Sequence, residues 1–130
     1  MAIPSNLRYT HDHEWARDEG DGSYTVGVTD FAQENLGGVV YGELPAGGTA
    51  GAAAGRFGTV ESTKSVSELY APVAGRVVAT NDALQGEPEL VNTDAYGNGW
   101  MVRIQAESAS EFNALMDASA YEAHVAAAAH

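Results

Sequence analysis

Residues 57–77 read FGTVESTKSVSELYAPVAGRV, and this stretch decides how the rest of the sequence is interpreted. The segments 56–62 and 66–70 carry the β-branched and aromatic side chains that are typical of short strands. Only Thr63, Lys64 and Ser65 separate them, so the pattern predicts a β hairpin with the lysine in its turn. A turn of this kind extends a lysine side chain into solvent. Its small hydroxyl-bearing neighbours leave room for an enzyme to modify the amine.

Lys64 also stands out in the composition. The 130-residue chain has this one lysine beside five arginines, and its formal net charge is −12. Such an acidic chain has little with which to displace phosphate counterions, which argues against binding nucleic acid or an anionic membrane. The chain has no cysteine, which excludes disulfides, cysteine zinc sites and thiol nucleophiles. No apolar run approaches a membrane span and the first residues do not resemble a targeting signal, so we expect a soluble cytoplasmic protein.

The segments around the hairpin predict more short strands separated by glycine turns. Residues 9–17 are expected to be extended and to pair with 23–28, where Tyr24, Val26 and Val28 alternate on one face. A capping-box pattern predicts a short helix over 29–38, with Asp30 and Gln33 as the box and Gly37 as the stop. Further strands are expected at 39–44, 76–80 and 100–105, and a glycine- and alanine-rich loop at 46–55. The pattern is that of a mainly β protein, a sandwich or small barrel with helices at its edges.

The C-terminal part changes character and predicts two helices. Two successive capping boxes start them, and apolar side chains at helical spacing follow. The boxes are Ser108 with Glu111 and Ser119 with Glu122, and the apolar residues are Phe112, Leu115, Met116, Tyr121 and Val125. We expect this helical segment, about 108–127, to lie against a sheet edge and cover unpaired backbone. With no linker in the sequence, we expect one domain over 1–130, with its core at about 24–106.

The hairpin stretch VESTKSVSELYAPVAGRV resembles the lipoyl-lysine hairpin of the glycine cleavage system H-protein family. Five further blocks occur in the order that the family shows, and together they extend the resemblance over about residues 7–121. They are HEW at 13–15, GVTDFAQENLG at 27–37, VVYGELPAGG at 39–48, PELVN at 88–92 and YGNGWM at 96–101. The resemblance implies a barrel-sandwich hybrid, that is, two small antiparallel sheets of the lipoyl and biotinyl type, with short helices.

The same resemblance implies the function of a carrier. Lipoate would be joined to Lys64 by an amide and would take the aminomethyl group of glycine from the pyridoxal-phosphate-dependent glycine decarboxylase. A tetrahydrofolate-dependent aminomethyltransferase would remove it, and dihydrolipoyl dehydrogenase would reoxidise the arm. The implied partners also include a lipoyl-attaching enzyme, and the protein itself would catalyse nothing. Gly48 and Gly75 bracket the lysine as glycines do in lipoyl and biotinyl domains, although turns demand glycine in any case.

Four acidic residues are candidates for holding the amine of the loaded arm. They are Glu14 and Asp12 near the HEW block, and Glu61 and Glu68 on the two hairpin strands. This is a hypothesis from acidic clustering and the order of the blocks. The competing interpretation is that these carboxylates are ordinary solvated surface.

Several alternatives use the same residues. On a strand, His11 and His13 would share one face, but two ligands do not make a structural zinc site, and no metal is predicted. An H-like protein that donates lipoate to 2-oxoacid dehydrogenases remains open. Biotin carriage is disfavoured, because biotin hairpins typically place methionine on both sides of the lysine. A Schiff-base enzyme would need a buried Lys64, the opposite of a turn position, and an unmodified interaction module is the last alternative.

Overall fold

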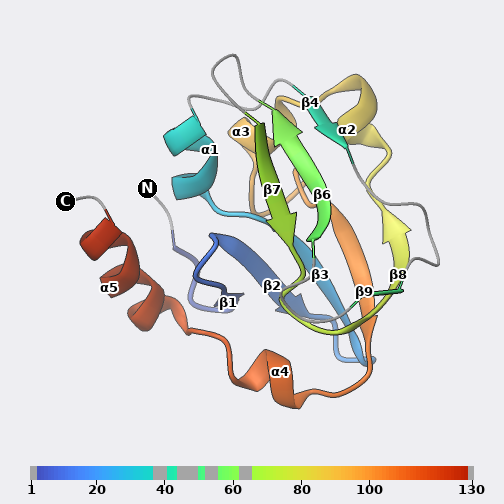
Figure 1. The fold of residues 1–130 in the computed structure, drawn as a ribbon, viewed down its shortest axis with the longest axis vertical. Helices are drawn as coiled ribbons and strands as arrows, with labels where there is room; N and C mark the ends of the chain where they lie inside the picture. Colours follow the sequence, from blue (N-terminus) through green and yellow to red (C-terminus); the bar gives the residue numbers. More distant parts are fainter. Residues whose placement is uncertain (1–2, 37–40, 44–49, 52–55, 62–65, 129–130) are drawn as a thin grey trace.

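The computed structural model describes residues 3–36, 41–43, 50–51, 56–61 and 66–128 (Figure 1). Lys64 and Gly48, two of the predicted site residues, lie outside the described residues. The strands are β1 (Arg8–Tyr9), β2 (Glu14–Asp18), β3 (Ser23–Val28), β4 (Tyr41–Glu43), β5 (Ala50–Gly51), β6 (Arg56–Glu61), β7 (Val66–Tyr70), β8 (Gly75–Thr80) and β9 (Val102–Ala106). The helices are α1 (Asp30–Leu36), α2 (Ala83–Gly86), α3 (Leu90–Thr93), α4 (Ser110–Asn113) and α5 (Ala118–Ala128).

The strands form two antiparallel sheets. One has six strands in the order β1-β2-β3-β9-β8-β5, and the other has three in the order β4-β6-β7. β6 and β7 pair in continuous register from Gly58 to Glu61, where Glu61 lies opposite Val66, after a register shift between Arg56 and Gly58. These sheets and the short helices confirm the predicted mainly β class. β5 was not predicted, because its two residues lie in a glycine- and alanine-rich stretch without a strand pattern.

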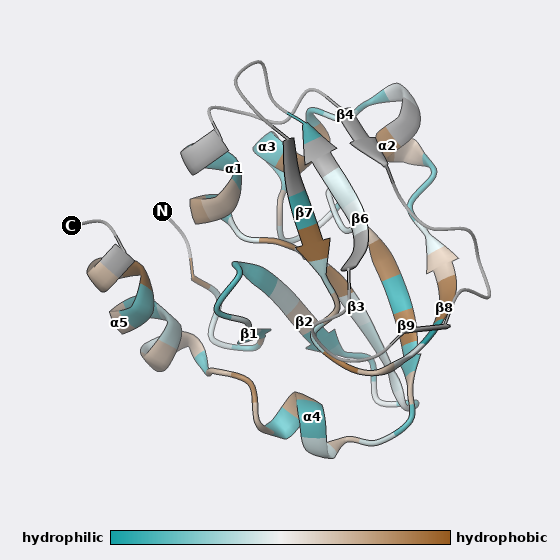
Figure 2. Cartoon of the chain, viewed as in Figure 1, coloured by the Kyte–Doolittle hydropathy of each residue, from teal (hydrophilic) through white to brown (hydrophobic). Residues whose placement is uncertain are grey.

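The core is built around β3, which is buried along its whole length. Tyr24 and Val26 face residues of β8 and β9, as the alternation predicts, and Val28 belongs to a second cluster with Leu69 of β7. Figure 2 shows hydrophobic residues on β7, β8 and β9. On the other face, Gly27 leaves room for an indole, since a Cβ there would lie 2.7 Å from Cζ2 of Trp15.

The predicted strand over residues 9–17 is wrong at its centre. Residues 10–13 form a turn between β1 and β2, closed by a hydrogen bond from the His13 backbone N–H to the Thr10 carbonyl at 3.2 Å. His13 has a positive φ of 70°, which is incompatible with an extended strand. The inference that His11 and His13 share a strand face is therefore wrong as well.

The C-terminal segment covers the edge strand, though partly with extended backbone. α4 ends at Asn113, so Leu115 and Met116 are not part of the predicted helical stripe. Met116 instead pairs with Tyr9 of β1 through two backbone hydrogen bonds of 2.8 and 3.0 Å. Tyr121 of α5 is fully buried and stacks on the Tyr9 ring, with centroids 4.5 Å apart. The expectation that this segment covers a sheet edge is confirmed.

The predicted capping boxes are wrong, because the predicted pairs of side chains do not cap the helix starts. The carboxylate of Glu111 accepts the backbone N–H of Ala74 at 2.8 Å and ties α4 to the chain before β8. α5 is capped by Asp117, whose carboxylate accepts the Ala120 N–H at 2.8 Å. α1 is preceded by Thr29, whose hydroxyl accepts a backbone N–H of the first turn at 3.3 Å. Thr29 and Asp117 lie one and two positions before the predicted Asp30 and Ser119, so for these helices the error lies in the boundary. The N-cap of α4 is Ala109, which makes no side-chain capping bond.

Candidate functional site

The turn over residues 10–13 places Glu14 at the start of β2 with its side chain inside the protein. Only 1% of Glu14 is exposed. The Thr10 hydroxyl is 2.7 Å from one Glu14 carboxyl oxygen and also accepts the Glu14 backbone N–H at 3.1 Å. The other carboxyl oxygen accepts the Tyr70 backbone N–H at 3.4 Å, across to the end of β7. Glu14 thus bridges the six-stranded sheet and the hairpin strand.

The environment of Glu14 favours its neutral form. Burial raises the pKa of this carboxyl to about 8, and the charge of Asp12 acts in the same direction. The hydrogen bonds from Thr10 and Tyr70 lower the pKa but do not offset burial. Among the described residues, no basic side chain forms an ion pair with Glu14. A positively charged group that entered here would convert the carboxyl to its carboxylate.

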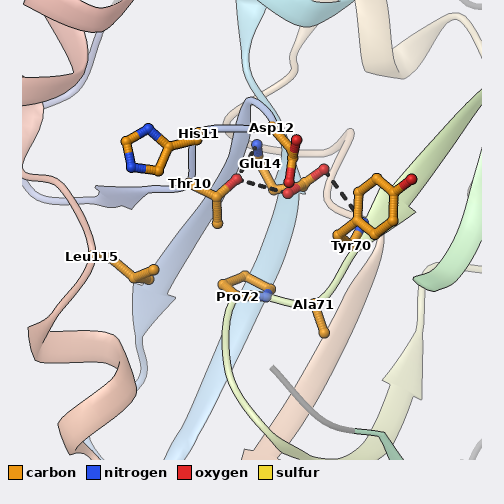
Figure 3. Close-up of a pocket in the computed structure, with 8 residues that line it drawn as sticks. All are labelled: Thr10, His11, Asp12, Glu14, Tyr70, Ala71, Pro72 and Leu115. Atoms are coloured by element: carbon orange, nitrogen blue, oxygen red, sulfur yellow. Dashed lines mark hydrogen bonds between the residues drawn. The ribbon is translucent and has the colours of Figure 1, made fainter. Parts of the chain in front are cut away.

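Glu14 lines a cavity of about 200 Å³. The described residues around it are Thr10, His11, Asp12, Glu14, Tyr70, Ala71, Pro72 and Leu115. Figure 3 shows the carboxyl groups of Asp12 and Glu14 near each other, with Tyr70 on the far side of Glu14 from Thr10. Ala71, Pro72 and Leu115 supply an apolar wall opposite these polar groups. The cavity therefore combines an apolar surface with two carboxyl groups, which suits a small cationic group on a hydrocarbon chain.

The structure brings some of the predicted site residues together and leaves others apart. Asp12 and Glu14 line the cavity. Glu68 is exposed and reaches its edge indirectly, since it accepts a hydrogen bond of 2.8 Å from the Tyr70 hydroxyl. Glu61 ends β6 opposite Val66 and is not among the described lining residues. Gly75 starts β8, where a Cβ would lie 2.1 Å from the Gln105 carbonyl oxygen, so close backbone packing explains this glycine.

The remaining lining residues were missed at the sequence level. Thr10 precedes Glu14 by four residues, and this spacing becomes informative once residues 10–13 are known to form a turn. Tyr70, Ala71 and Pro72 directly follow the hairpin strand, where the Pro signalled the end of β7. Leu115 comes from the far end of the chain, and no local pattern points to it.

Residues 7–128 match the family model described as glycine cleavage H-protein. This chain belongs to the glycine cleavage H-protein family. A glycine cleavage system H protein of Cronobacter sakazakii is 51% identical over 121 residues, 93% of this chain and 94% of the relative. A protein of the same name from Mycolicibacterium vanbaalenii is 52% identical over 127 residues, 95% of this chain and 97% of the relative. The family resemblance found in the sequence is confirmed.

A solved structure supports the same assignment at the level of the fold. The crystal structure of a glycine cleavage system H protein from Mycobacterium marinum matches with a TM-score of 0.84 and 39% sequence identity. The match covers 93% of this chain and 97% of that one. The two antiparallel sheets thus form the predicted barrel-sandwich hybrid of the H-protein family.

Two further observations concern the described residues of this H-protein. No described helix is both long and apolar enough to span a membrane. In the same part of the chain, no group of three or more histidine, aspartate or glutamate side chains could hold a metal ion.

Proposed function

We propose that this H-protein carries lipoate in amide linkage on Lys64 and transports the aminomethyl group of glycine. The observation that carries the proposal is the place of the chain's only lysine. It lies in the four residues that connect two strands paired to their ends, within a chain that matches the H-protein family over residues 7–128. Lipoate, when attached, supplies a cyclic disulfide that can be reduced and can accept the group.

The chain acts as a carrier and not as a catalyst. Its partners are glycine decarboxylase, the tetrahydrofolate-dependent aminomethyltransferase, dihydrolipoyl dehydrogenase and a lipoyl-attaching enzyme, and we place this system in the cytoplasm. A long flexible lysine stem lets one attached group reach several active sites in turn, and tethering raises its local concentration there. The net charge of −12 favours docking faces that are basic.

The cavity at Glu14 fits the loaded arm in chemistry and polarity. The apolar wall of Ala71, Pro72 and Leu115 suits the hydrocarbon part of such an arm. The carboxyl groups of Glu14 and Asp12 suit an amine that carries a positive charge. Since Glu14 has no cationic partner among the described residues, the amine would supply the missing charge and would be held out of water.

Thr10 and Tyr70 orient the Glu14 carboxyl for this role. Their hydrogen bonds fix it from two sides, and the Thr10 bond of 2.7 Å is the shorter one. Asp12 is exposed at the rim, so it attracts a cation without a comparable desolvation penalty. The chain's contribution is thus to bind an amine and exclude water, which would slow hydrolysis of the labile sulfur–carbon–nitrogen unit.

Attachment is tested by intact-mass measurement after incubation with a lipoyl ligase and lipoate. The wild-type protein is expected to gain the mass of one lipoyl group, and Lys64→Arg is expected to gain none. A wild-type protein that stays unmodified would overturn the proposal. Reconstituted glycine–bicarbonate exchange with the decarboxylase then tests carriage. Transfer of lipoate to a 2-oxoacid dehydrogenase domain without such exchange would instead support the donor alternative.

The role of the cavity is tested with Glu14→Gln, a neutral substitution of similar shape. In the loaded protein, we expect hydrolysis at least about tenfold faster than in wild type, which corresponds to losing one modest ion pair. The matched control is Glu87→Gln, which removes an exposed carboxyl outside the cavity lining. Equal hydrolysis rates in Glu14→Gln and wild type would show that Glu14 does not hold the amine.

A further inference from the structure

Three histidines from two distant parts of the chain meet at the turn over residues 10–13. His11 and His13 belong to the turn before β2, and His124 belongs to α5. The His124 ring lies edge-on to His11 with centroids 4.9 Å apart, and stacks on His13 at 5.3 Å. Imidazole is the side chain whose charge changes near neutral pH, so a proton on one ring changes the contacts that it makes with its neighbours.

α5 is attached to the turn at two points, one turn of helix apart. Nε2 of His124 donates a hydrogen bond of 2.9 Å to the backbone carbonyl of His11. The Tyr121 hydroxyl is 2.8 Å from Nδ1 of His13 and 2.7 Å from the Thr29 hydroxyl. Because Tyr121 is fully buried, this side of α5 is fixed in the core, while His124 reaches towards the surface.

The turn that α5 holds is also a wall of the cavity. Thr10, His11 and Asp12 line it, and Thr10 orients Glu14. α5 contributes no described lining residue of its own. A change in the docking of α5 would therefore reach the cavity through the His11 carbonyl and the His13 ring.

Burial and the two neighbouring histidines oppose protonation of His13. Burial lowers the pKa of His13, and His124 and His11 lower it further, whereas Asp12 raises it. His11 and Asp12 lie in its own turn, with Glu14 directly after it. α5 faces it with His124 and Tyr121, and α1 packs the uncharged Phe31 against it. Because the folded state resists a proton that the unfolded turn accepts, the docked arrangement loses stability as pH falls below 6.5.

We propose that His124 is a positioning residue for the cavity, and that a proton taken up by His13, beside His11 and His124, releases α5 from the turn and loosens the cavity wall. The proposal concerns the unmodified chain. It depends on the proposed function only where release of α5 is taken to expose the loaded arm to water.

Amide hydrogen exchange on the unmodified protein tests the release directly. Between pH 7.5 and 5.5, after correction for intrinsic rates, we expect protection of α5 and of the amides of Thr10, His13 and Glu14 to fall at least about fivefold. His124→Gln keeps an N–H donor for the His11 carbonyl but cannot be protonated. It should retain protection at pH 7.5 and show a smaller fall at pH 5.5 than wild type, because one of the charges that opposes a proton on His13 is gone while the burial of His13 remains. His124→Ala should lose protection at both pH values.

The control is Glu122→Gln, which changes a charge on the same helix at an exposed position. It should follow the wild-type pH profile. The proposal is overturned if His124→Gln shows the same fall as wild type. It is also overturned if His124→Ala weakens α5 and leaves the turn amides unchanged, because then the helix and the turn are not coupled. If His124→Ala does not fold, the comparison of His124→Gln with wild type still decides.

Hydrolysis of the loaded protein supplies a second measurement that separates this inference from the proposed function. If release occurs, hydrolysis in wild type should accelerate between pH 7.5 and 5.5 more than in His124→Gln. A second outcome is that hydrogen exchange couples α5 to the turn while hydrolysis accelerates no more in wild type than in His124→Gln. That outcome would support the positioning role of His124 and would count against binding of the loaded arm in the cavity. An acceleration equal in both proteins would show that the histidine cluster does not control the arm.

Discussion

Two glutamates stand at opposite ends of β2, and their carboxyl groups experience opposite environments. Glu14 begins the strand, is 1% exposed and has the Thr10 hydroxyl 2.7 Å away. Glu19 directly follows the strand and accepts a hydrogen bond of 2.6 Å from the Thr25 hydroxyl. Each carboxyl therefore has a threonine partner, but Glu19 also has Arg17 at 2.8 Å.

The difference shows that a hydroxyl alone does not keep a buried carboxyl ionised. The bonds from Thr25 and Arg17 lower the pKa of Glu19 at the surface. Burial raises the pKa of Glu14 to about 8 despite its bond to Thr10. A cation and access to water decide the charge. Glu14 is buried and has no cationic partner in the part of the chain that the structure describes, and this is the end of β2 at which we propose that a positively charged amine binds.

The largest expected effect on stability is that of Glu14→Gln. The folded-state pKa of about 8 exceeds the ordinary value of 4.5, so wild type loses stability as pH rises through this window. At pH 7 the ionisable carboxyl costs about 3 kcal/mol relative to a neutral isostere. Urea unfolding of both proteins should show that Glu14→Gln is more stable, with a gain that is small at pH 4.5 and largest above pH 8.

Glu19→Gln is the matched control and should have the opposite sign. Its folded-state pKa is lowered, so wild-type Glu19 adds stability above the ordinary pKa and loses it as pH falls. Because this group is partly solvated, we expect a loss below about 1 kcal/mol at pH 7. If both glutamine variants changed the free energy of unfolding in the same direction, the contrast between the two ends of β2 would be wrong.

The sequence predicted the strands of this fold better than the turn that precedes β2. The strand Ser23–Val28 and the hairpin β6–β7 follow from alternation and β-branched content, and both are confirmed. The turn over residues 10–13 contains neither glycine nor proline, so the sequence pattern predicts a continuous strand there. The shape of this turn depends on long-range contacts with α5, such as the hydrogen bond between His13 and Tyr121. A local sequence pattern cannot predict such contacts.

Only part of the candidate site was predicted, because the rest of it depends on contacts between segments that are distant in the sequence. Asp12 and Glu14 could be named because they lie in and beside a sequence block of the family. Tyr70 and Leu115 join them only in three dimensions, and burial of Glu14 depends on all of these segments. The cavity, and the raised pKa inside it, therefore required the structure.

A smaller change in the free energy of unfolding is expected from removing the threonine hydroxyl that contacts each glutamate, Thr10 at Glu14 and Thr25 at Glu19. Thr10→Val leaves a buried carboxyl oxygen and the Glu14 backbone N–H without their partner, which costs about 2 kcal/mol. The loss should be larger at pH 9 than at pH 5, since the bond stabilises the carboxylate. Thr25→Val should cost less than about 1 kcal/mol, because Arg17 still serves Glu19. Urea unfolding at both pH values measures each loss, and equal losses would contradict the comparison.

The smallest effect is expected from Arg17→Gln, which removes the ion pair to Glu19. The pair joins side chains that are 36% and 24% exposed, so water already screens it. The guanidinium also lies 5.8 Å from the Trp15 ring, and the two contacts together should contribute about 0.5–1 kcal/mol. The loss should shrink in 0.5 M salt, measured by urea unfolding, because exposed pairs are screened. The gain in Glu14→Gln should not change with salt, since it reflects desolvation and not pairing. A salt-independent loss in Arg17→Gln would mean that packing on Trp15, and not charge, distinguishes this end of β2.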